Sequence, residues 1–177
     1  ELMGAAVSLK GYPLSFLVGE QHNTLVDDRM NRFREMMNIE IIHRGVAVRG
    51  VLRALRNNEF VALLSDQDAR DQGVFVDFFG RPSSTHQGAA VFALKTGAPV
   101  IFGSAVRMPD DTHEAVIDYI PTDGYNGVSE ENIRQLTQEY TSVLEGMIRR
   151  YPDHWFWMHR RWKTLWILAP LNVEVKG

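Results

Sequence analysis

The stretch LSFLVGEQHNTLVDDRMNRFREMMNIEIIHRGVAVRGVLRALRNNEFVALLS, residues 14–65, decides the fold. Short apolar runs, each long enough for one strand, alternate in it with longer segments whose apolar residues recur every three or four positions. The first pattern is typical of a buried strand and the second of an amphipathic helix. Strands that alternate with helices usually pair side by side into a largely parallel sheet. The stretch therefore predicts an α/β fold.

The rest of the chain continues this alternation without an internal repeat or a long linker. A chain of 177 residues is long enough to bury one core, so we expect a single domain, 1–177, with one mixed and mostly parallel sheet flanked by helices. The segment Gly73–Pro82 is rich in Phe and Val and is open to two interpretations, a strand or an ordered loop. The expected strands are Leu14–Val18, Glu40–His43, Phe60–Ser65, Pro99–Val106 and Glu114–Ile120, and the expected helices are Leu2–Leu9, Thr24–Met37, Ala47–Asn57, Gln87–Thr96 and Glu130–Tyr151.

Composition excludes several classes of protein. Hydrophobic residues make up 45% and charged residues 23% of the chain, which is ordinary for a globular domain. The net charge of −3 gives no basic field for nucleic acid. Because the chain has no cysteine, disulfides, thiolate metal sites and a cysteine acyl-enzyme are excluded. No nucleotide-binding glycine motif and no metal-binding histidine pair is present, so we expect no cofactor and no metal. No apolar run approaches the roughly 20 residues that span a bilayer.

The expected helix Thr24–Met37 carries two lines of residues. Val26, Met30, Phe33 and Met37 form an apolar stripe at helical spacing, which we expect to be buried. The polar line beside it is made of Asn23, Asp27 and Arg34. Polar groups at the border of a buried face are well placed for a functional site. A surface pattern of Asp27 and Arg34 with an Asn23 N-cap explains the same line.

Two other helices carry regular patterns. In Ala47–Asn57, the residues Val48, Val51, Leu52 and Leu55 share one face, and Arg49, Arg53 and Arg56 share another. The arginine face is typical of a solvated surface, and an acidic carrier protein or lipid phosphates are the alternative partners. In Glu130–Tyr151 the apolar stripe predicts core packing alone.

Three blocks of sequence together resemble one family. These are LLSDQDARDQGVFVDFFG at 63–80, THQGAAVFALKTGAPVIFG at 85–103 and PDHWFWMHRRWK at 152–163. In order and spacing they resemble the lipid A biosynthesis late acyltransferases, the lauroyl- and myristoyltransferase family of the lysophospholipid acyltransferase superfamily. The resemblance implies a glycerol-3-phosphate-acyltransferase-like fold. It covers essentially the whole chain.

The resemblance also implies a motif, H-x-x-x-x-E, at the start of the chain. Glu1 followed by a small-residue helix is similar to its carboxylate end. We therefore expect an N-terminally truncated domain, in which the motif histidine lies five positions before Glu1 and a membrane anchor lies further upstream. We expect the chain by itself to be inactive without that histidine.

Further positions follow from the resemblance one at a time. Asn23, Asp27 and Arg34 match the family's polar helix line, which is also the line that the helical spacing singles out. Arg44 matches the arginine that follows the next strand. The D-x-D motif falls on residues 66–68, Asp66, Gln67 and Asp68.

The chemistry that the resemblance implies is acyl transfer to a hydroxyl. The upstream histidine acts as general base, and Glu1 orients the imidazole and stabilises the imidazolium. We expect Arg34 to stabilise negative charge and Asp66 to orient Arg34 or the acceptor. Asn23, Asp27, Gln67 and Asp68 are expected to bind substrate. Arg44 is expected to hold an acceptor phosphate, and an ion pair with Asp66 or Asp68 is the alternative.

Aromatic residues allow two interpretations. Trp155, Trp157 and Trp162 beside Arg160, Arg161 and Lys163 suit a membrane interface, or a structural segment with buried rings. Phe75, Phe78 and Phe79 suit an acyl groove or the core.

The resemblance implies an acyl carrier protein or acyl-CoA donor, a lipid A precursor as glycolipid acceptor, and a place at the cytoplasmic face of the bacterial inner membrane. Alternatives are a phosphatidylinositol-mannoside or glycerophospholipid acyltransferase and a catalytically silent lipid-binding relative.

Overall fold

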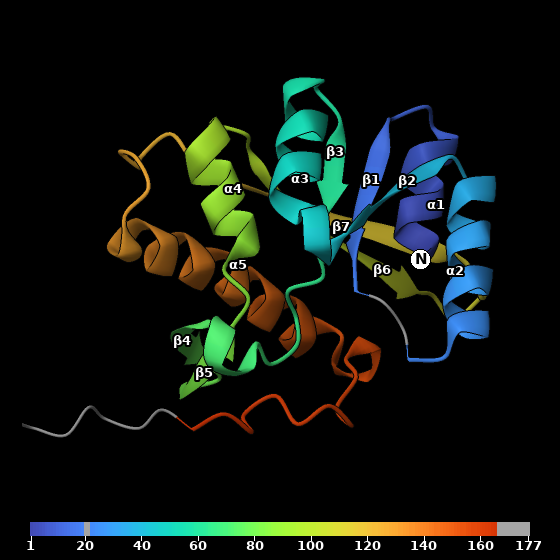
Figure 1. Ribbon diagram of the computed structural model, residues 1–177. Coiled ribbons are helices and arrows are strands. Elements are labelled where there is room, and N and C mark those ends of the chain that lie inside the picture. The colour runs from blue at the N-terminus through green and yellow to red at the C-terminus, as the bar shows by residue number, and fades with distance from the viewer. Residues whose placement is uncertain (20–21, 166–177) are drawn as a thin grey trace, which may run out of the picture.

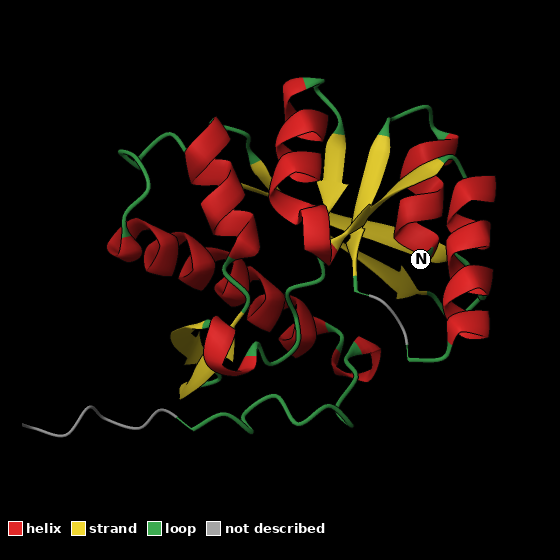
Figure 2. Cartoon of the chain, in the orientation of Figure 1, coloured by secondary structure: helices red, strands yellow, loops and turns green. Residues whose placement is uncertain are grey.

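The computed structural model describes residues 1–19 and 22–165, which form an α/β arrangement of five α-helices and three small sheets (Figures 1 and 2). The α-helices are α1 (Leu2–Leu9), α2 (Thr24–Met36), α3 (Ala47–Arg56), α4 (Gly88–Thr96) and α5 (Glu130–Arg150). The strands are β1 (Leu14–Val18), β2 (Ile39–His43), β3 (Phe60–Ala62), β4 (Val74–Phe78), β5 (Arg81–Thr85), β6 (Val100–Arg107) and β7 (His113–Ile120). Short 3₁₀ turns, η1 (Arg44–Val46), η2 (Arg70–Gln72) and η3 (Pro152–His154), join some of them.

The alternating stretch forms the expected parallel sheet, with strand order β2-β1-β3. Strand β1 is central and pairs in parallel with both neighbours, Leu14 opposite Ile39 on one side and Phe60 on the other. The expectation of one continuous mixed sheet is wrong for the described residues. Strands β6 and β7 pair with each other as an antiparallel hairpin, and β4 and β5 form a second one.

The hairpin β4–β5 resolves the ambiguity of Gly73–Pro82. Most of this segment is strand, and the turn residues Phe79 and Gly80 both have positive φ, 57° and 72°. Two such residues between antiparallel strands are the signature of a type I′ hairpin. The hairpin docks on α5, where the Gln138 amide both accepts from the Asp77 N–H and donates to the Asp77 carbonyl. Strand β5 was not anticipated from sequence.

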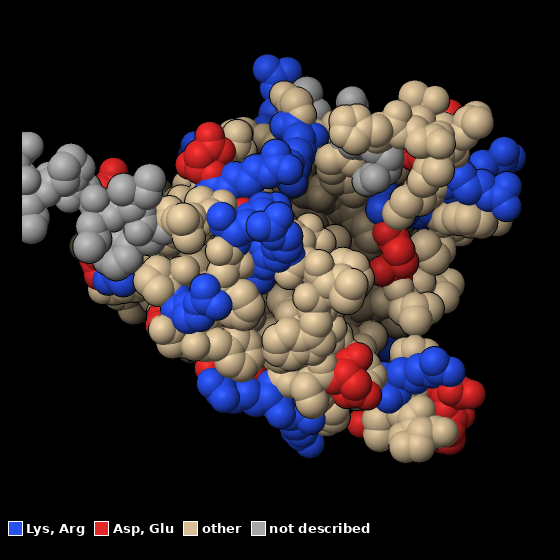
Figure 3. Space-filling view, turned by 90° about the horizontal axis from the view of Figure 1, so that it is seen from below, with Lys and Arg blue, Asp and Glu red and all other residues tan. Residues whose placement is uncertain are grey.

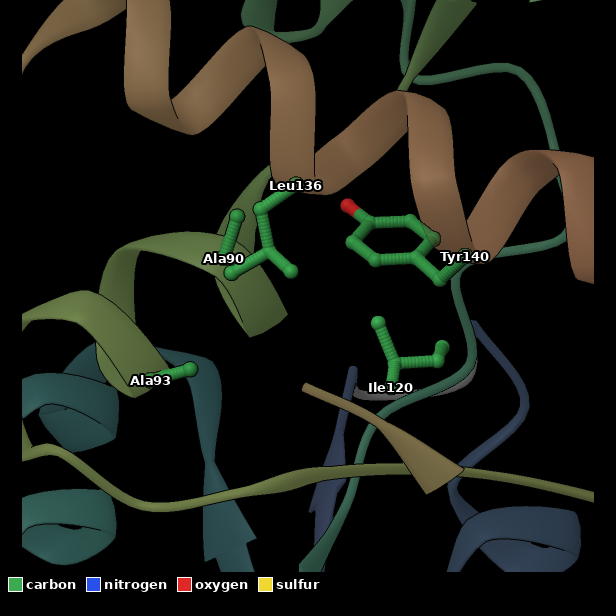
Figure 4. Close-up of a cluster of buried hydrophobic side chains, with 5 residues drawn as sticks. All are labelled: Ala90, Ala93, Ile120, Leu136 and Tyr140. Carbon is green, nitrogen blue, oxygen red and sulfur yellow. The ribbon is translucent and has the colours of Figure 1, made fainter. Parts of the chain in front are cut away.

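The described core is divided into small clusters. Leu136 and Tyr140 of the expected stripe of α5 are buried and pack against α4 and the end of β7, as Figure 4 shows with Ala90, Ala93 and Ile120. A second cluster of Ile42, Val51 and Ala54 joins α3 to the parallel sheet. On α3, Val51 is buried and Val48 is exposed, and the arginine face is solvent-exposed, with Arg53 paired to Glu40.

Helix α1 bridges the parallel sheet and the β6–β7 hairpin. A Cβ on Gly4 would overlap the Phe16 ring on β1, so glycine allows the helix to lie directly on the sheet. The Met3 side chain lies against Gly103 on β6. This packing holds the first residue of the chain beside the sheet.

Candidate functional site

The centre of the candidate site is an ion pair between Glu1 and Arg34. The Arg34 Nη2 donates to Glu1 Oε1 at 2.7 Å and the Arg34 Nε donates to Oε2 at 3.3 Å. Two parallel bonds from one guanidinium fix the plane of the carboxylate as well as its position. Arg34 is only 8% exposed, although it lies on the last turn of a surface helix. The structure thus brings together two of the three residues predicted to be catalytic.

Asn31 supports the ion pair from the same helix. Its side-chain oxygen accepts from Arg34 Nη1 at 2.9 Å, and its amide nitrogen donates to Asp27 Oδ2 at 3.1 Å. Two of the three residues of the predicted polar line, Asp27 and Arg34, are therefore connected through Asn31, and Arg34 in turn binds Glu1. Asn31 was not identified from sequence, although it lies four residues after Asp27 and three before Arg34. That spacing was the available signal.

Helix α2 is turned relative to the expectation, so that the neighbouring polar line faces inward and only part of the apolar stripe does. The apolar stripe was expected to be buried, but Val26 and Phe33 are 46% and 48% exposed, and Arg34 is buried. The guanidinium lies 5.8 Å from the centre of the Phe16 ring, which favours its inward position. The paired carboxylate and the ring together compensate for removing this charge from water.

The ion pair keeps Glu1 ionised. The hydrogen bonds from Arg34 hold the pKa of the carboxyl below its ordinary value of 4.5, against the opposing effect of partial burial. Because the folded pKa is the lower one, the stabilising contribution is present above about pH 4.5 and is lost as the pH falls through the lowered value. At neutral pH the carboxylate is therefore a stable hydrogen-bond acceptor.

Glu1 and Arg34 are among the residues that line a largely apolar cavity of about 330 Å³. Its walls come from α1, β1, α3, β3, α4 and β6. A neighbouring cavity of about 340 Å³ contains Asp66 and shares Leu63, Leu64 and Ile101 with the first. The carboxylate and the guanidinium thus flank a common cleft.

Asp66, Arg44 and His86 form a second polar region. Asp66 follows β3 and Arg44 follows β2, so both lie past the carboxyl ends of parallel strands, where ligands bind in such sheets. Burial lowers the pKa of His86, and Arg44 and Arg161 lower it further, while Asp66 and Asp68 oppose them. His86 was not identified from sequence, because a single histidine without a spaced partner carries no pattern.

This second region is distinct from the Glu1–Arg34 pair. Arg34 is held by Glu1 and Asn31, and no ion pair within the described part of the chain joins it to Asp66, so the expected orientation of Arg34 by Asp66 is not observed. The alternative role of Arg44, an ion pair with Asp66 or Asp68, is likewise not observed among the salt bridges of residues 1–19 and 22–165.

The remaining predicted substrate-binding residues lie apart from the ion pair. Asn23 is the N-cap of α2 and accepts from the N–H groups of Leu25 and Val26. Gln67 is exposed. Asp68 is buried and accepts from the Thr164 hydroxyl at 2.8 Å and from the Arg70 N–H at 3.0 Å. These bonds give Asn23 and Asp68 structural roles.

The aromatic C-terminal block divides into a buried and an exposed half. Trp155 and Trp162 pack on Phe78, and the buried Arg161 donates to the Ser84 carbonyl at 2.6 Å and to the Thr85 hydroxyl at 2.5 Å. Phe78 is fully buried. For these residues the structural interpretation is the correct one.

The exposed half of the block consists of Phe156, Trp157 and Met158, which are 64%, 52% and 82% exposed. Arg160 and Lys163 are exposed beside them. The face seen in Figure 3 carries groups of Lys and Arg side chains next to a broad uncharged area. Within the described residues no helix is long and apolar enough to cross a membrane, and no three potential ligands gather as a metal would require.

Comparisons with known proteins extend these observations. A family model described as bacterial lipid A biosynthesis acyltransferase matches residues 1–164. The chain is 29% identical over 154 residues to a lipid A biosynthesis palmitoleoyltransferase of Escherichia coli K12, a match that covers 86% of this chain and 49% of that protein. It is 34% identical over 73 residues to a phosphatidylinositol mannoside acyltransferase of Mycobacterium tuberculosis, with 39% of this chain and 23% of that protein covered. The chain thus spans about half the length of the lipid A relatives it matches.

Proposed function

Because this chain belongs to the bacterial lipid A biosynthesis acyltransferase family, we propose that its full-length protein transfers a fatty acyl group from a thioester to a hydroxyl of a lipid A precursor. The single observation that carries the proposal is the bidentate Glu1–Arg34 pair in the lining of an apolar cleft. A fixed, ionised carboxylate beside an apolar wall suits a reaction in which a neutral imidazole becomes charged next to an apolar acyl chain.

In the proposed mechanism, a histidine five positions before Glu1 removes the proton of the acceptor hydroxyl. The hydroxyl oxygen attacks the thioester carbonyl, the carbon–sulfur bond breaks, and the proton passes to the leaving thiolate. Glu1 accepts a hydrogen bond from the imidazole and stabilises the imidazolium as it forms. No covalent acyl-enzyme is required.

Arg34 takes a more specific role in this mechanism than the sequence suggested. Three of its five N–H groups are used on Glu1 and Asn31, so its first task is to fix Glu1 and keep it ionised. The polar line from Asp27 through Asn31 holds the guanidinium in turn. Arg44, past the carboxyl end of β2, is the proposed contact for an acceptor phosphate.

We propose acyl carrier protein as the donor, with acyl-CoA as the alternative. The second candidate acceptor is a phosphatidylinositol mannoside, which is favoured by the 34% identity to an acyltransferase of that printed specificity. Incubating the full-length protein with a thioester donor and each acceptor separately, followed by mass spectrometry of the lipid, distinguishes them. Our proposal requires one added acyl group on the lipid A precursor. Acylation of the mannoside alone would contradict the lipid A proposal and support the second candidate acceptor. No acylation of any acceptor would indicate a catalytically silent relative.

We further propose that residues Phe156–Met158 contact the cytoplasmic face of the bacterial inner membrane. Exposed apolar side chains flanked by Arg160 and Lys163 suit an interface with anionic headgroups. Phe156 also lines the cavity that contains Asp66, so this contact would place the membrane next to the site.

Replacing both Trp157 and Met158 by Ser is expected to lower the association of the 177-residue chain with anionic liposomes by about 10-fold or more. The reason is that burying one such side chain contributes about 1.5–3 kcal/mol. Co-sedimentation with vesicles measures the effect. Val128→Ser is the matched control, because Val128 is 51% exposed, close to the 52% of Trp157. Equal binding of the double variant and the control would remove the loop from the membrane contact.

A further inference from the structure

The segment that follows β3 carries Asp66 but does not fix it through the side chain of that residue. Residues 63–67 belong to no helix or strand, and those up to Asp66 line one cavity. In the part of the chain that the structure describes, the Asp66 carboxylate forms no ion pair and accepts no hydrogen bond. Its position therefore depends on the backbone on either side, which β3 holds before it and Asp68 holds after it.

Asp68 is held by two residues of the C-terminal block. Its backbone N–H donates to Nε2 of His159 at 3.0 Å, and its carboxylate accepts from the Thr164 hydroxyl at 2.8 Å and from the Thr164 N–H at 3.4 Å. Asp68 is only 7% exposed, and hydrogen bonds to a buried carboxylate are stronger than the same bonds in water. Residues 91 and 96 positions later in the chain thus fix this point of the segment.

Arg161 extends this hold to the strand beside Asp68. The guanidinium is buried and donates to the Ser84 carbonyl and the Thr85 hydroxyl at the end of β5. Thr85 in turn pairs with Asp68 in an antiparallel bridge. The same C-terminal segment therefore binds both partners of the bridge. We name the three side chains of His159, Arg161 and Thr164 the C-terminal clamp.

The clamp is not needed merely to dock the C-terminal segment. Trp155 and Trp162 already pack on Phe78, and this apolar contact holds the segment beside the β4–β5 hairpin (Figure 1). Apolar contact is non-directional, so by itself it does not specify where the backbone of Asp68 lies. Hydrogen bonds require defined distances and angles, and they do specify it.

We propose that the C-terminal clamp positions Asp66 for acyl transfer, because His159 and Thr164 hold Asp68 and thereby keep Asp66, two residues earlier, at the wall of its cavity. None of the three clamp residues lines that cavity, so they act through Asp66 and not on the substrate. The inference rests on the proposed function, since Asp66 has a substrate to act on only if the full-length protein is an acyltransferase.

The first test measures hydrogen–deuterium exchange in the full-length protein and needs no activity. His159→Leu removes the acceptor of the Asp68 N–H, so we expect this amide to exchange at least about 10-fold faster. Thr164→Val keeps the shape of the side chain but removes its hydroxyl, and it should speed exchange in the same segment. His159→Gln keeps an acceptor at a similar distance from the backbone, so its exchange should stay close to that of the unmodified protein.

Two controls accompany these exchange rates. His113→Leu is the matched control, because His113 is exposed on β7, and it should leave exchange at Asp68 unchanged. The amides of α3 should exchange at the same rate in every variant, because no clamp residue forms a hydrogen bond to that helix within the described residues.

The second test asks whether the clamp acts through Asp66. We expect His159→Leu to lower the turnover number for acyl transfer by about 10-fold or more, because a displacement of about 1 Å at a site is enough to cost 100-fold. In protein that already carries Asp66→Asn, the same substitution should lower the remaining turnover by less than about 2-fold. His159→Gln should retain near-normal turnover.

The contrary outcomes are distinct. Unchanged exchange at Asp68 in both His159→Leu and Thr164→Val would overturn the inference, and so would faster exchange throughout the chain in both. An equal loss of turnover with and without Asp66→Asn, or in His159→Leu and His159→Gln alike, would give the clamp a structural role only. If the unmodified protein transfers no acyl group, the proposed function fails, and the exchange rates still decide whether the clamp holds Asp68.

Discussion

Replacing Arg34 by Ala in the full-length protein is expected to lower the turnover number by about 100-fold or more, the effect typical of removing one preorganised charged donor. The side chain fixes both oxygens of Glu1 and keeps the carboxylate ionised, so its loss frees the group that orients the proposed base. Initial rates of thioester consumption measure the effect.

Two further variants separate catalysis from folding. Arg32→Ala is the matched control, because Arg32 is exposed on the same helix, and it should retain near-normal turnover. Arg34→Lys keeps the charge but cannot form the two parallel bonds, so it should remain strongly impaired at an unchanged melting temperature. Full activity of Arg34→Lys would show that only the charge matters, and full activity of Arg34→Ala would remove the residue from the site.

Replacing Phe78 by Ala is expected to destabilise the protein by about 3–5 kcal/mol, the usual cost of deleting a buried aromatic side chain. The ring is fully buried, and the rings of Phe79, Trp162 and Trp155 lie 4.8, 5.5 and 5.9 Å from it. It also lies under the Arg161 guanidinium at 5.1 Å. The substitution would therefore leave a cavity and weaken the anchoring of the C-terminal block.

Urea unfolding followed by circular dichroism measures this loss. Phe156→Ala is the matched control, because the same residue type is 64% exposed there, and surface substitutions usually change stability by less than about 0.5 kcal/mol. If both variants lost the same stability, the Phe78 cluster would not be a stabilising core.

The parallel sheet was predictable because its signals are local. Between residues 14 and 65 the strand and helix periodicities alternate clearly, and each observed boundary except the end of β3 lies within one residue of the expected one. Strand β5 was missed because Pro82 disfavours a strand and the turn Phe79-Gly80 lacks the Asn-Gly or Asp-Gly signature. The division into three sheets depends on pairing between distant segments, which periodicity does not encode.

The candidate site was predictable in part. The spacing of α2 and the family resemblance both selected Arg34, which is paired with Glu1 and lines the same cavity. Periodicity alone predicted a buried apolar stripe, whereas Val26 and Phe33 are exposed and Arg34 faces inward. The Phe16 ring and Glu1 carboxylate stabilise Arg34 inside, and both come from other elements. The roles of Asn23 and Asp68 as cap and anchor equally depend on backbone groups that a sequence pattern does not show.

The most direct test of the proposed chemistry is the rate of acyl transfer to a lipid A precursor by full-length protein with Glu1→Gln, measured by mass spectrometry of the acylated lipid. Glutamine keeps the size of the side chain and an oxygen for Arg34 but cannot stabilise an imidazolium by charge. We expect a rate reduced by about 100-fold or more with the fold intact. An unchanged rate of acylation would contradict it.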